Sequence, residues 1–168
     1  QLAFKYFQTL PQGYWMCSSP FLMNAGTQTP MLSACFVLGI EDEMTSIFGT
    51  LYDAAMVHKS GGGTGFDLSK LRSKGSTIGT TGGVASGPLS FLRLYDLESD
   101  VVKQGGRRRA ANMGALRIDH PDILEFIDAK RDKSKFTNFN LSVIIPNWFM
   151  GAVESGLNYP LKDHKGIE

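Results

Sequence analysis

Cysteine is the most reactive side chain in this sequence, and Cys35 lies in a setting that suits chemistry. It follows residues 18–34, which are rich in Ser, Thr, Gly and Pro, and it opens the short apolar run Cys35–Leu38. Such a run is typical of a buried strand, and a thiol at a strand edge indicates redox or nucleophilic chemistry. The alternative is structural, because free cysteine is among the residues most often buried as a small hydrophobe.

Two segments without regular structure are expected near Cys35, namely residues 18–34, which precede it, and a glycine turn at residues 58–65. Pro20, Gly26 and Pro30 are expected to interrupt any helix in the approach. The turn, His58–Gly65, contains three consecutive glycines that end the preceding helix and allow a sharp return with positive φ and close backbone approach.

Six blocks of this sequence, in order and in spacing, resemble the catalytic chain of ribonucleotide reductases. A glycine triplet alone is weak evidence, but six blocks in succession specify a family. The glycine block, residues 101–109 and residues 112–114 are most similar to the adenosylcobalamin-dependent class (class II). The six blocks are residues 19–27, 33–36, 59–65, 72–76, 104–108 and 120–126.

The resemblance implies that the chain is part of the family's ten-stranded α/β barrel, from its first half. It also implies reduction of ribonucleotides to deoxyribonucleotides by thiyl-radical chemistry, in which two cysteines supply the electrons and form a disulfide while a third carries the radical. Cys35 matches the first reducing cysteine. The other two would lie beyond this chain, so residues 1–168 are expected to be a partial barrel domain, with upstream and downstream parts missing, and inactive alone.

Three residues match positions that contact the substrate in the family: Ser19, Ala34 and Gly63. Ala34 precedes the cysteine and would make its contact through the backbone, while Gly63 would let backbone amides approach the nucleotide. Each has a simpler alternative from the sequence itself. Ser19 could make a local turn hydrogen bond, and Gly63 could be a helix stop.

Three charged residues match the site at which the family binds a deoxynucleoside triphosphate effector: Asp42, Lys59 and Arg72. Lys and Arg can hold phosphates, and an acidic side chain can accept a hydrogen bond from a ribose hydroxyl. The alternative for each is a solvated surface charge. The effector is expected to bind in a homodimer formed by helices near Met44–Lys59 and Pro88–Val102.

The resemblance also implies partners: adenosylcobalamin as cofactor, a thiol reductant such as thioredoxin, and a ribonucleoside di- or triphosphate as substrate. Two other classes of function remain open on the sequence. One is a catalytically inactive nucleotide-binding module or fragment, and the other is a non-catalytic α/β interaction domain.

Composition limits these possibilities. The chain has 168 residues, 42% of them hydrophobic, which is enough for a domain with a core. Its net charge of +1 gives no general field for polyanions, so direct DNA binding is not expected. No apolar stretch approaches the roughly 20 residues needed to cross a bilayer, and a cytoplasmic location is expected.

Only two cysteines are present, too few for a disulfide framework and without zinc-site spacing. Cys17 matches no functional position of the family, and a buried or half-buried thiol is expected there. His58, His120 and His164 show no ligand spacing, so no protein metal site is expected.

Hydrophobic periodicity predicts alternating strands and helices, hence an α/β fold with parallel strands and right-handed crossovers. Residues 75–87 are expected to be a loop. Asp119 or His120 is expected to cap the helix predicted over residues 121–130. The predicted strands are 35–40, 66–71, 111–118 and 139–145, and the predicted helices are 2–10, 44–59, 88–105, 121–130 and 147–153.

Overall fold

The computed structural model describes residues 5, 7–28, 31–79, 82–102 and 111–162. The chain divides into two compact units, residues 1–34 and residues 35–168. Of the predicted helix over residues 2–10, the structure describes residue 5 and residues 7–10, of which 5 and 7 are helical and 8–10 form a turn. Residues 104–108, one of the six blocks, lie outside the described residues. No helix among the described residues is long and apolar enough to span a membrane.

The first unit contains helix α2 (Ser19–Asn24), where the sequence predicted none. The prediction was wrong because Pro20 lies in the first turn of the helix. There, proline costs no hydrogen bond and its fixed φ already suits the helix. The helix ends before Gly26, which has a φ of +78°, and the Asn24 side chain donates a hydrogen bond to the Met31 carbonyl at 2.8 Å.

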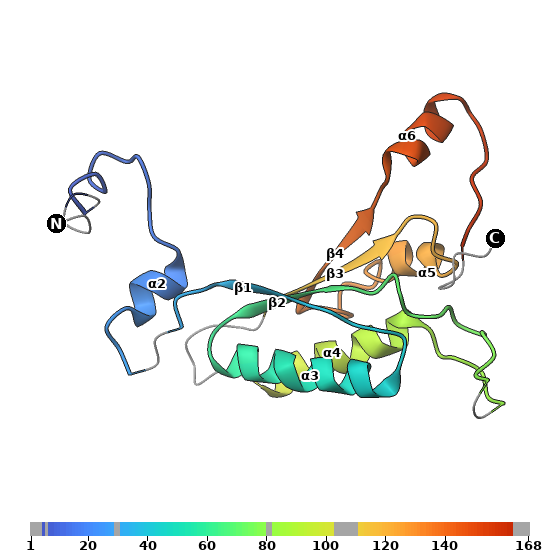
Figure 1. Ribbon diagram of the computed structural model, residues 1–168, viewed down its shortest axis with the longest axis horizontal. Coiled ribbons are helices and arrows are strands. Elements are labelled where there is room, and N and C mark those ends of the chain that lie inside the picture. The colour runs from blue at the N-terminus through green and yellow to red at the C-terminus, as the bar shows by residue number, and fades with distance from the viewer. Residues whose placement is uncertain (1–4, 6, 29–30, 80–81, 103–110, 163–168) are drawn as a thin grey trace. The chain divides into compact units, whose positions relative to one another are not determined.

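The second unit is built on a four-stranded parallel sheet, as the alternation of elements predicted. The strands are β1 (Cys35–Leu38), β2 (Gly63–Asp67), β3 (Asn112–Arg117) and β4 (Phe139–Ile144), and they lie side by side in sequence order. Parallel neighbours need crossover connections. These carry α3 (Met44–Lys59), α4 (Pro88–Val101) and α5 (Ile123–Asp128), and α6 (Asn147–Glu154) follows β4 (Figure 1).

Two of these elements begin elsewhere than predicted. Strand β2 starts at Gly63 rather than near Phe66, because Gly61, with a φ of +97°, already completes the turn. Helix α5 has its N-cap at Asp122 rather than at Asp119 or His120. The Asp119 carboxylate is held instead by Arg117, at 2.6 and 2.8 Å.

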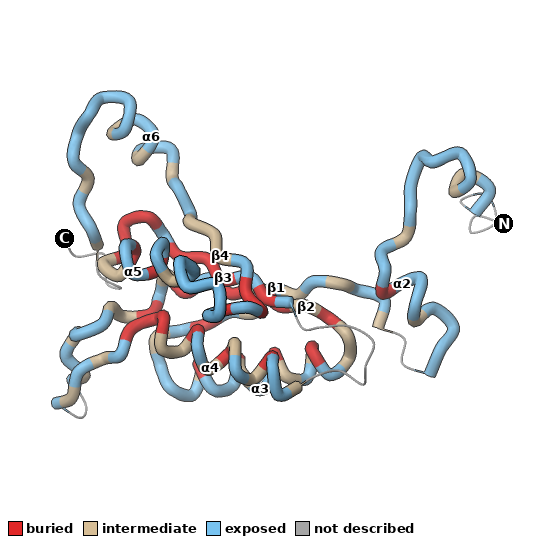
Figure 2. Tube along the Cα trace, turned by 180° about the vertical axis from the view of Figure 1, so that it is seen from behind, coloured by how far each residue is buried: buried red, intermediate tan, exposed pale blue. Residues whose placement is uncertain are grey.

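The residues of β2 alternate between the two faces of the sheet, and α3 and α4 cover one of these faces. Thr64 and Phe66 point to the covered face and are buried, whereas Gly63, Gly65 and Asp67 belong to the other. Figure 2 shows the buried residues gathered along the strands and on the side of α3 that faces them. The apolar core comprises Ile40, Ile47, Ala54, Phe66, Leu68, Leu71, Leu89, Leu92, Tyr95, Leu116, Ile118, Ile123, Phe126, Phe136 and Phe139.

Specific contacts hold the two helices to the sheet. The Tyr95 hydroxyl of α4 donates to the Ile47 carbonyl of α3 at 2.6 Å, and the Tyr95 ring stacks on Phe66 at a centroid distance of 4.8 Å. Gly62 lies so close to α3 that a Cβ there would be 2.6 Å from Val57 Cγ1. A side chain there would have to displace Val57 or Phe36, so glycine is favoured at the point where α3 returns to the sheet.

Candidate functional site

Cys35 lies at the start of β1, and its side chain is exposed. The prediction of a buried strand was wrong at this point, because Cys35 and Val37 are on the face that α3 and α4 leave open, where Val37 is 89% exposed. The structural alternative for this cysteine, a buried small hydrophobe, is therefore also wrong. Cys17 is half-buried, as predicted.

The neighbouring strand offers only backbone beside this thiol. Cys35 pairs in register with Gly63, and Val37 pairs with Gly65. Because side chains alternate along a strand, both glycines are on the face of Cys35. A Cβ at Gly65 would meet its nearest atoms at 3.9 to 4.0 Å, an ordinary contact distance, so packing does not require glycine there. The pair of glycines leaves open space next to an exposed thiol.

The other two predicted substrate residues belong to the first unit. Ser19 is the first residue of α2 and is exposed, and Ala34 is joined to Cys35 by a peptide bond. The structure thus brings Cys35 and Gly63 together as strand partners, and it describes Ser19 and Ala34 only within their own unit.

Asp42 and Arg72, two of the predicted effector residues, form an ion pair. The Arg72 Nε donates to Asp42 Oδ2 at 2.8 Å, and the Arg72 backbone N–H donates to Asp42 Oδ1 at 3.0 Å. Both side chains remain partly exposed, at 28% and 20%. The pair therefore holds a guanidinium in a fixed position that solvent, or an anion, can still reach.

This pair lines a pocket of about 510 Å³, within the usual range for small-molecule sites. Its walls come from the start of α3, from Phe91 of α4, and from Ile78 and residues 84–87, with a mixture of apolar and charged side chains. The predicted loop over residues 75–87 forms part of these walls. Hydrogen bonds between Gly75 and Ala85 and between Ile78 and Gly83, together with a bridge between Thr77 and Val84, give it a hairpin-like shape.

Lys59, the third predicted effector residue, is not near this pocket. It is exposed at the last position of α3, whereas the pocket lies at the first turn. At 1.5 Å per residue the two ends of this 16-residue helix are roughly 22 Å apart. One copy of the chain does not bring Lys59 to Arg72.

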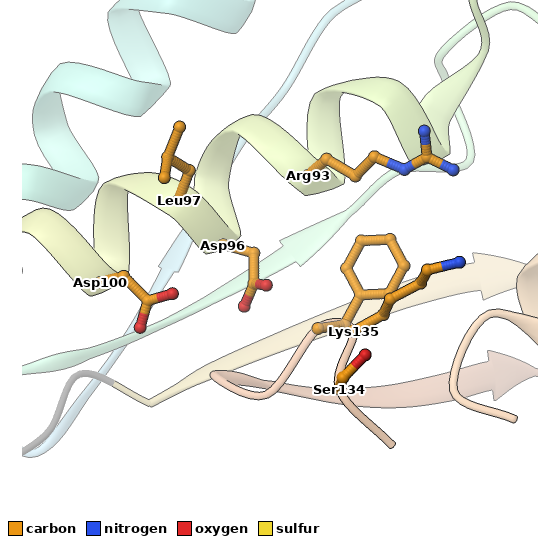
Figure 3. Close-up of a pocket in the computed structure, with 7 residues that line it drawn as sticks. Arg93, Asp96, Leu97, Asp100, Ser134 and Lys135 are labelled. Atoms are coloured by element: carbon orange, nitrogen blue, oxygen red, sulfur yellow. The ribbon is translucent and has the colours of Figure 1, made fainter. Parts of the chain in front are cut away.

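A second pocket, of about 420 Å³, lies between α4 and residues 134–136. Figure 3 shows Arg93, Asp96 and Asp100 projecting from α4 on this side, near Ser134 and Lys135. The two carboxylates accept hydrogen bonds from the backbone and side chain of Asn138, at 3.1 and 2.9 Å. None of the predicted site residues lines this pocket, and its acidic side chains serve to hold the segment that leads into β4.

Sequence reasoning missed a group of polar side chains that is buried between α3, α4 and the sheet. His58 and Asn112, at 0% and 3% exposure, belong to it, as do Glu98, Thr64 and Ser99. Their separations in sequence leave no local pattern to find, apart from the helical spacing that places Ser99 on the same face of α4 as Leu92 and Tyr95. No group of three or more His, Cys, Asp or Glu side chains in the described parts of the chain could hold a metal ion.

Comparisons with known proteins agree with this architecture. The family described as "Ribonucleotide reductase, barrel domain" matches residues 33–167. The vitamin B12-dependent ribonucleoside-diphosphate reductases of Thermoplasma acidophilum and Mycobacterium tuberculosis are each 52% identical to this chain over 82% of its length. The ribonucleoside-diphosphate reductase large subunit of Caenorhabditis elegans is 33% identical over 95% of this chain.

A solved structure gives the same result at the level of the fold. The class Id ribonucleotide reductase alpha subunit of Actinobacillus ureae superposes with a TM-score of 0.77 over 92% of this chain and 28% of that chain, at 26% identity. The chain spans about a fifth of the length of the curated relatives it matches. These matches, together with the parallel α/β sheet, show that the chain belongs to the ribonucleotide reductase family and is part of its barrel domain.

Proposed function

We propose that the protein containing this chain reduces ribonucleotides to deoxyribonucleotides, with Cys35 as one of its two reducing thiols. The observation that carries the proposal is the exposed Cys35 on the open sheet face, paired in register with Gly63. A ribose can approach a thiol there without displacing a side chain of β2. Family membership supplies the reaction, and the geometry supports the role of this residue in it.

The proposed step is a two-electron reduction. The hydroxyl on C2′ of the ribose leaves as water, a C2′–H bond replaces the C2′–O bond, and two thiols lose their hydrogens to become a disulfide. Cysteine combines an acidic proton with reversible oxidation, and serine lacks the second property. The second thiol would come from residues outside this chain, and a thiol reductant such as thioredoxin would restore both.

Substrate contacts are proposed at three positions. Gly63 would present its backbone to the nucleotide beside Cys35, Ala34 would do the same from the preceding peptide, and Ser19 would contribute its exposed hydroxyl. Backbone N–H groups without neighbouring side chains suit phosphate and ribose oxygens.

Adenosylcobalamin is the proposed cofactor of the whole enzyme, since the names of two relatives specify vitamin B12 dependence. When bound, it would supply the radical initiator. The described histidines do not fit it as cobalt ligands, because His58 and His120 are buried and both nitrogens of each ring are engaged in hydrogen bonds. We therefore assign no residue of this chain to the cofactor.

A deoxynucleoside triphosphate effector is proposed to bind at the pocket of Asp42 and Arg72. Arg72 would hold its phosphates, and Asp42, which already positions the guanidinium, would accept a hydrogen bond from a ribose hydroxyl. Because Lys59 is at the far end of α3, it would take part only through a second copy of the chain.

The outer surface of α3 supports such a homodimer. Met44, Phe48, Tyr52 and Met56 follow one another at intervals of four residues and are 43 to 65% exposed, which makes a continuous apolar stripe. Leu97 and Val101 of α4 are exposed as well, at 61% and 74%. A twofold axis that pairs two α3 helices in antiparallel orientation would bury both stripes and bring Lys59 of the partner subunit toward Arg72.

The central test is the substitution Cys35→Ser in the full-length enzyme. We expect sustained deoxyribonucleotide formation to be abolished, because serine cannot form the disulfide, while the near-isosteric side chain leaves nucleotide binding intact. Turnover would be measured with adenosylcobalamin and a thiol reductant. Cys17→Ser is the matched control and should retain activity.

Two outcomes would overturn parts of this proposal. Sustained turnover by the Cys35→Ser enzyme would remove Cys35 from the reaction. A wild-type protein that binds nucleotides but never forms a deoxyribonucleotide would favour the alternative of an inactive nucleotide-binding module.

The effector site is tested by Arg72→Ala. The loss of a charged hydrogen bond to phosphate is worth about 1.5–3 kcal/mol, so the effector Kd should rise at least about ten-fold in titration calorimetry. Lys74→Ala is the control, because Lys74 is 63% exposed and its only described ion pair, with Glu125, is on the surface at 3.4 Å. Unchanged affinity in the Arg72→Ala protein would remove this residue from the site.

A further inference from the structure

His58 lies in the last turn of α3, fully buried, with polar atoms on both sides of its ring. On one side its Nδ1 is 3.0 and 3.2 Å from the two carboxylate oxygens of Glu98 in α4. On the other side its Nε2 is 2.8 Å from Asn112 Oδ1 of β3 and 3.2 Å from Thr64 Oγ1 of β2. One side chain thus links four elements of the fold.

The hydrogen bonds around Asn112 determine what faces Nε2. The Ser99 hydroxyl donates to the Tyr95 carbonyl at 2.9 Å, so its oxygen is left to accept the Asn112 Nδ2–H at 2.6 Å. This orients the amide with Oδ1 toward His58. The Thr64 hydroxyl donates to the same Oδ1 at 2.5 Å. Both atoms facing Nε2 are therefore acceptors, and Nε2 must carry a hydrogen.

Glu98 of α4 occupies the Nδ1 side of the ring. Its two carboxylate oxygens lie at nearly equal distances from Nδ1, so the ring and the carboxyl group face each other squarely. The contact is shielded from water, because the Glu98 side chain is only 10% exposed. It therefore ties the last turn of α3 to α4.

His120 is a natural comparison, because it is also buried, at 3% exposure. The backbone N–H of Asp122 donates to its Nδ1 at 3.0 Å, so that nitrogen has no hydrogen, and Nε2 donates to the Leu71 carbonyl at 2.9 Å. Both partners of His120 are backbone groups, whereas the partners of His58 are side chains of three other elements. The side-chain network is therefore particular to the site of His58 rather than a consequence of burial.

The segment attached to His58 contains residues of the proposed function. Lys59 follows it directly, the Gly61 N–H donates to the His58 carbonyl at 3.0 Å, and the turn then delivers Gly63 to its pairing with Cys35. A side chain that fixes the last turn of α3 also fixes these residues.

We propose that His58 is a positioning residue whose buried hydrogen bond with Glu98 holds the end of α3, Lys59 and the Gly61–Gly63 turn in place for nucleotide binding. The effect on nucleotide binding rests on the proposed function. The claim that the contact fixes the end of α3 rests on the hydrogen-bond geometry alone. Glu98 is the only titratable group facing the ring among the described neighbours, because β2 and β3 contribute Thr64 and Asn112.

Two substitutions of Glu98 separate positioning from a general loss of stability. Glu98→Leu keeps most of the volume but leaves Nδ1 of His58 buried without a hydrogen-bond partner. Glu98→Gln keeps a partner, since the amide can hydrogen-bond Nδ1 while Nε2 keeps its contact with Asn112, so both links persist. Glu125→Leu, which removes an exposed carboxylate from the surface pair with Lys74, is the control.

The first measurement is hydrogen exchange of the full-length protein, followed by mass spectrometry of its peptides. We expect Glu98→Leu to speed exchange of residues 56–65 about ten-fold, while residues 44–52 and the segment around His120 change little. Glu98→Gln and Glu125→Leu should leave residues 56–65 as in the wild type. Equal protection in the Glu98→Leu protein, or uniform loss across all segments, would overturn the positioning role.

The second measurement is the Kd of a deoxynucleoside triphosphate. Glu98→Leu should raise it about ten-fold at a temperature where the variant is folded, and Glu98→Gln should restore it to within about two-fold of the wild type. A wild-type protein that binds no such nucleotide would overturn the proposed effector site, while the exchange data would still decide the positioning role. If the wild-type protein binds the nucleotide and the Glu98→Leu protein binds it with the same Kd, the role of His58 in nucleotide binding is overturned, while the proposed effector site stands.

Discussion

The two faces of the four-stranded sheet carry different kinds of residue. On the face that α3 and α4 cover, Thr64, Phe66 and Leu116 are 5%, 3% and 0% exposed and are packed against side chains of the helices. On the open face, Cys35 is exposed and its neighbours in β2 are Gly63 and Gly65. The covered face is filled, whereas the open face next to the thiol has no side chains from β2.

Strand β2 serves both faces with consecutive residues. Gly63 and Gly65 belong to the open face and Thr64 and Phe66 to the covered one, because side chains alternate along a strand. A substitution at a covered position of β2 is therefore expected to lower stability, whereas a substitution one residue away, at an open position, is expected to lower activity. This is the physical basis on which residues that hold the fold can be separated from those available for chemistry.

The largest effect on stability is expected at Leu116, on the covered face of β3. Leu116→Ala removes a fully buried side chain and should lower the free energy of unfolding by about 2–5 kcal/mol, measured by denaturant titration of the full-length protein. Met113→Ala, in the same strand but on the open face and 45% exposed, is the control and should cost less than half as much. Equal losses would mean that both faces are packed alike in the full protein, and the comparison would fail.

The sequence contained enough information for the covered face and for the order of the elements. The apolar periodicity of residues 44–59 and 88–105 predicted the two covering helices, and the β-branched run in residues 139–145 predicted β4 within one residue. Local patterns of this kind report which residues must leave water. The bounds of β2 were predicted less well, because three glycines carry no apolar pattern and their role depends on the neighbouring strands.

The site was predictable only in part, for a related reason. Cys35 could be selected from its chemistry, and its place on the open face follows once strand pairing is known. The ion pair of Asp42 with Arg72 joins residues 30 positions apart, and the hydrogen bond of His58 with Glu98 joins residues 40 apart. Pairs at such separations leave no periodic signal. The resemblance named Asp42 and Arg72 separately as effector residues, and only the structure revealed either contact.

Two glycines give a sharper test of the two faces, because the same substitution can be made at both. Gly62→Ala should lower the free energy of unfolding by about 1–3 kcal/mol, since its Cβ would be 2.6 Å from Val57 Cγ1 and 2.8 Å from Phe36 Cε2. Gly65→Ala should change it by less than about 0.5 kcal/mol, because the added methyl group meets only ordinary contacts.

The activity of the same two variants should show the opposite order. The methyl group of Gly65→Ala would occupy space on the face of Cys35, so kcat/KM for the ribonucleotide should fall roughly ten-fold, as expected for one added methyl group in a shaped site. Gly62→Ala, assayed well below its unfolding temperature, should lose less, because its methyl group points toward α3. If Gly65→Ala left kcat/KM unchanged, the open space beside the thiol would not be where the substrate lies, and the role assigned to the β2 glycines would be lost even if Cys35 remained essential.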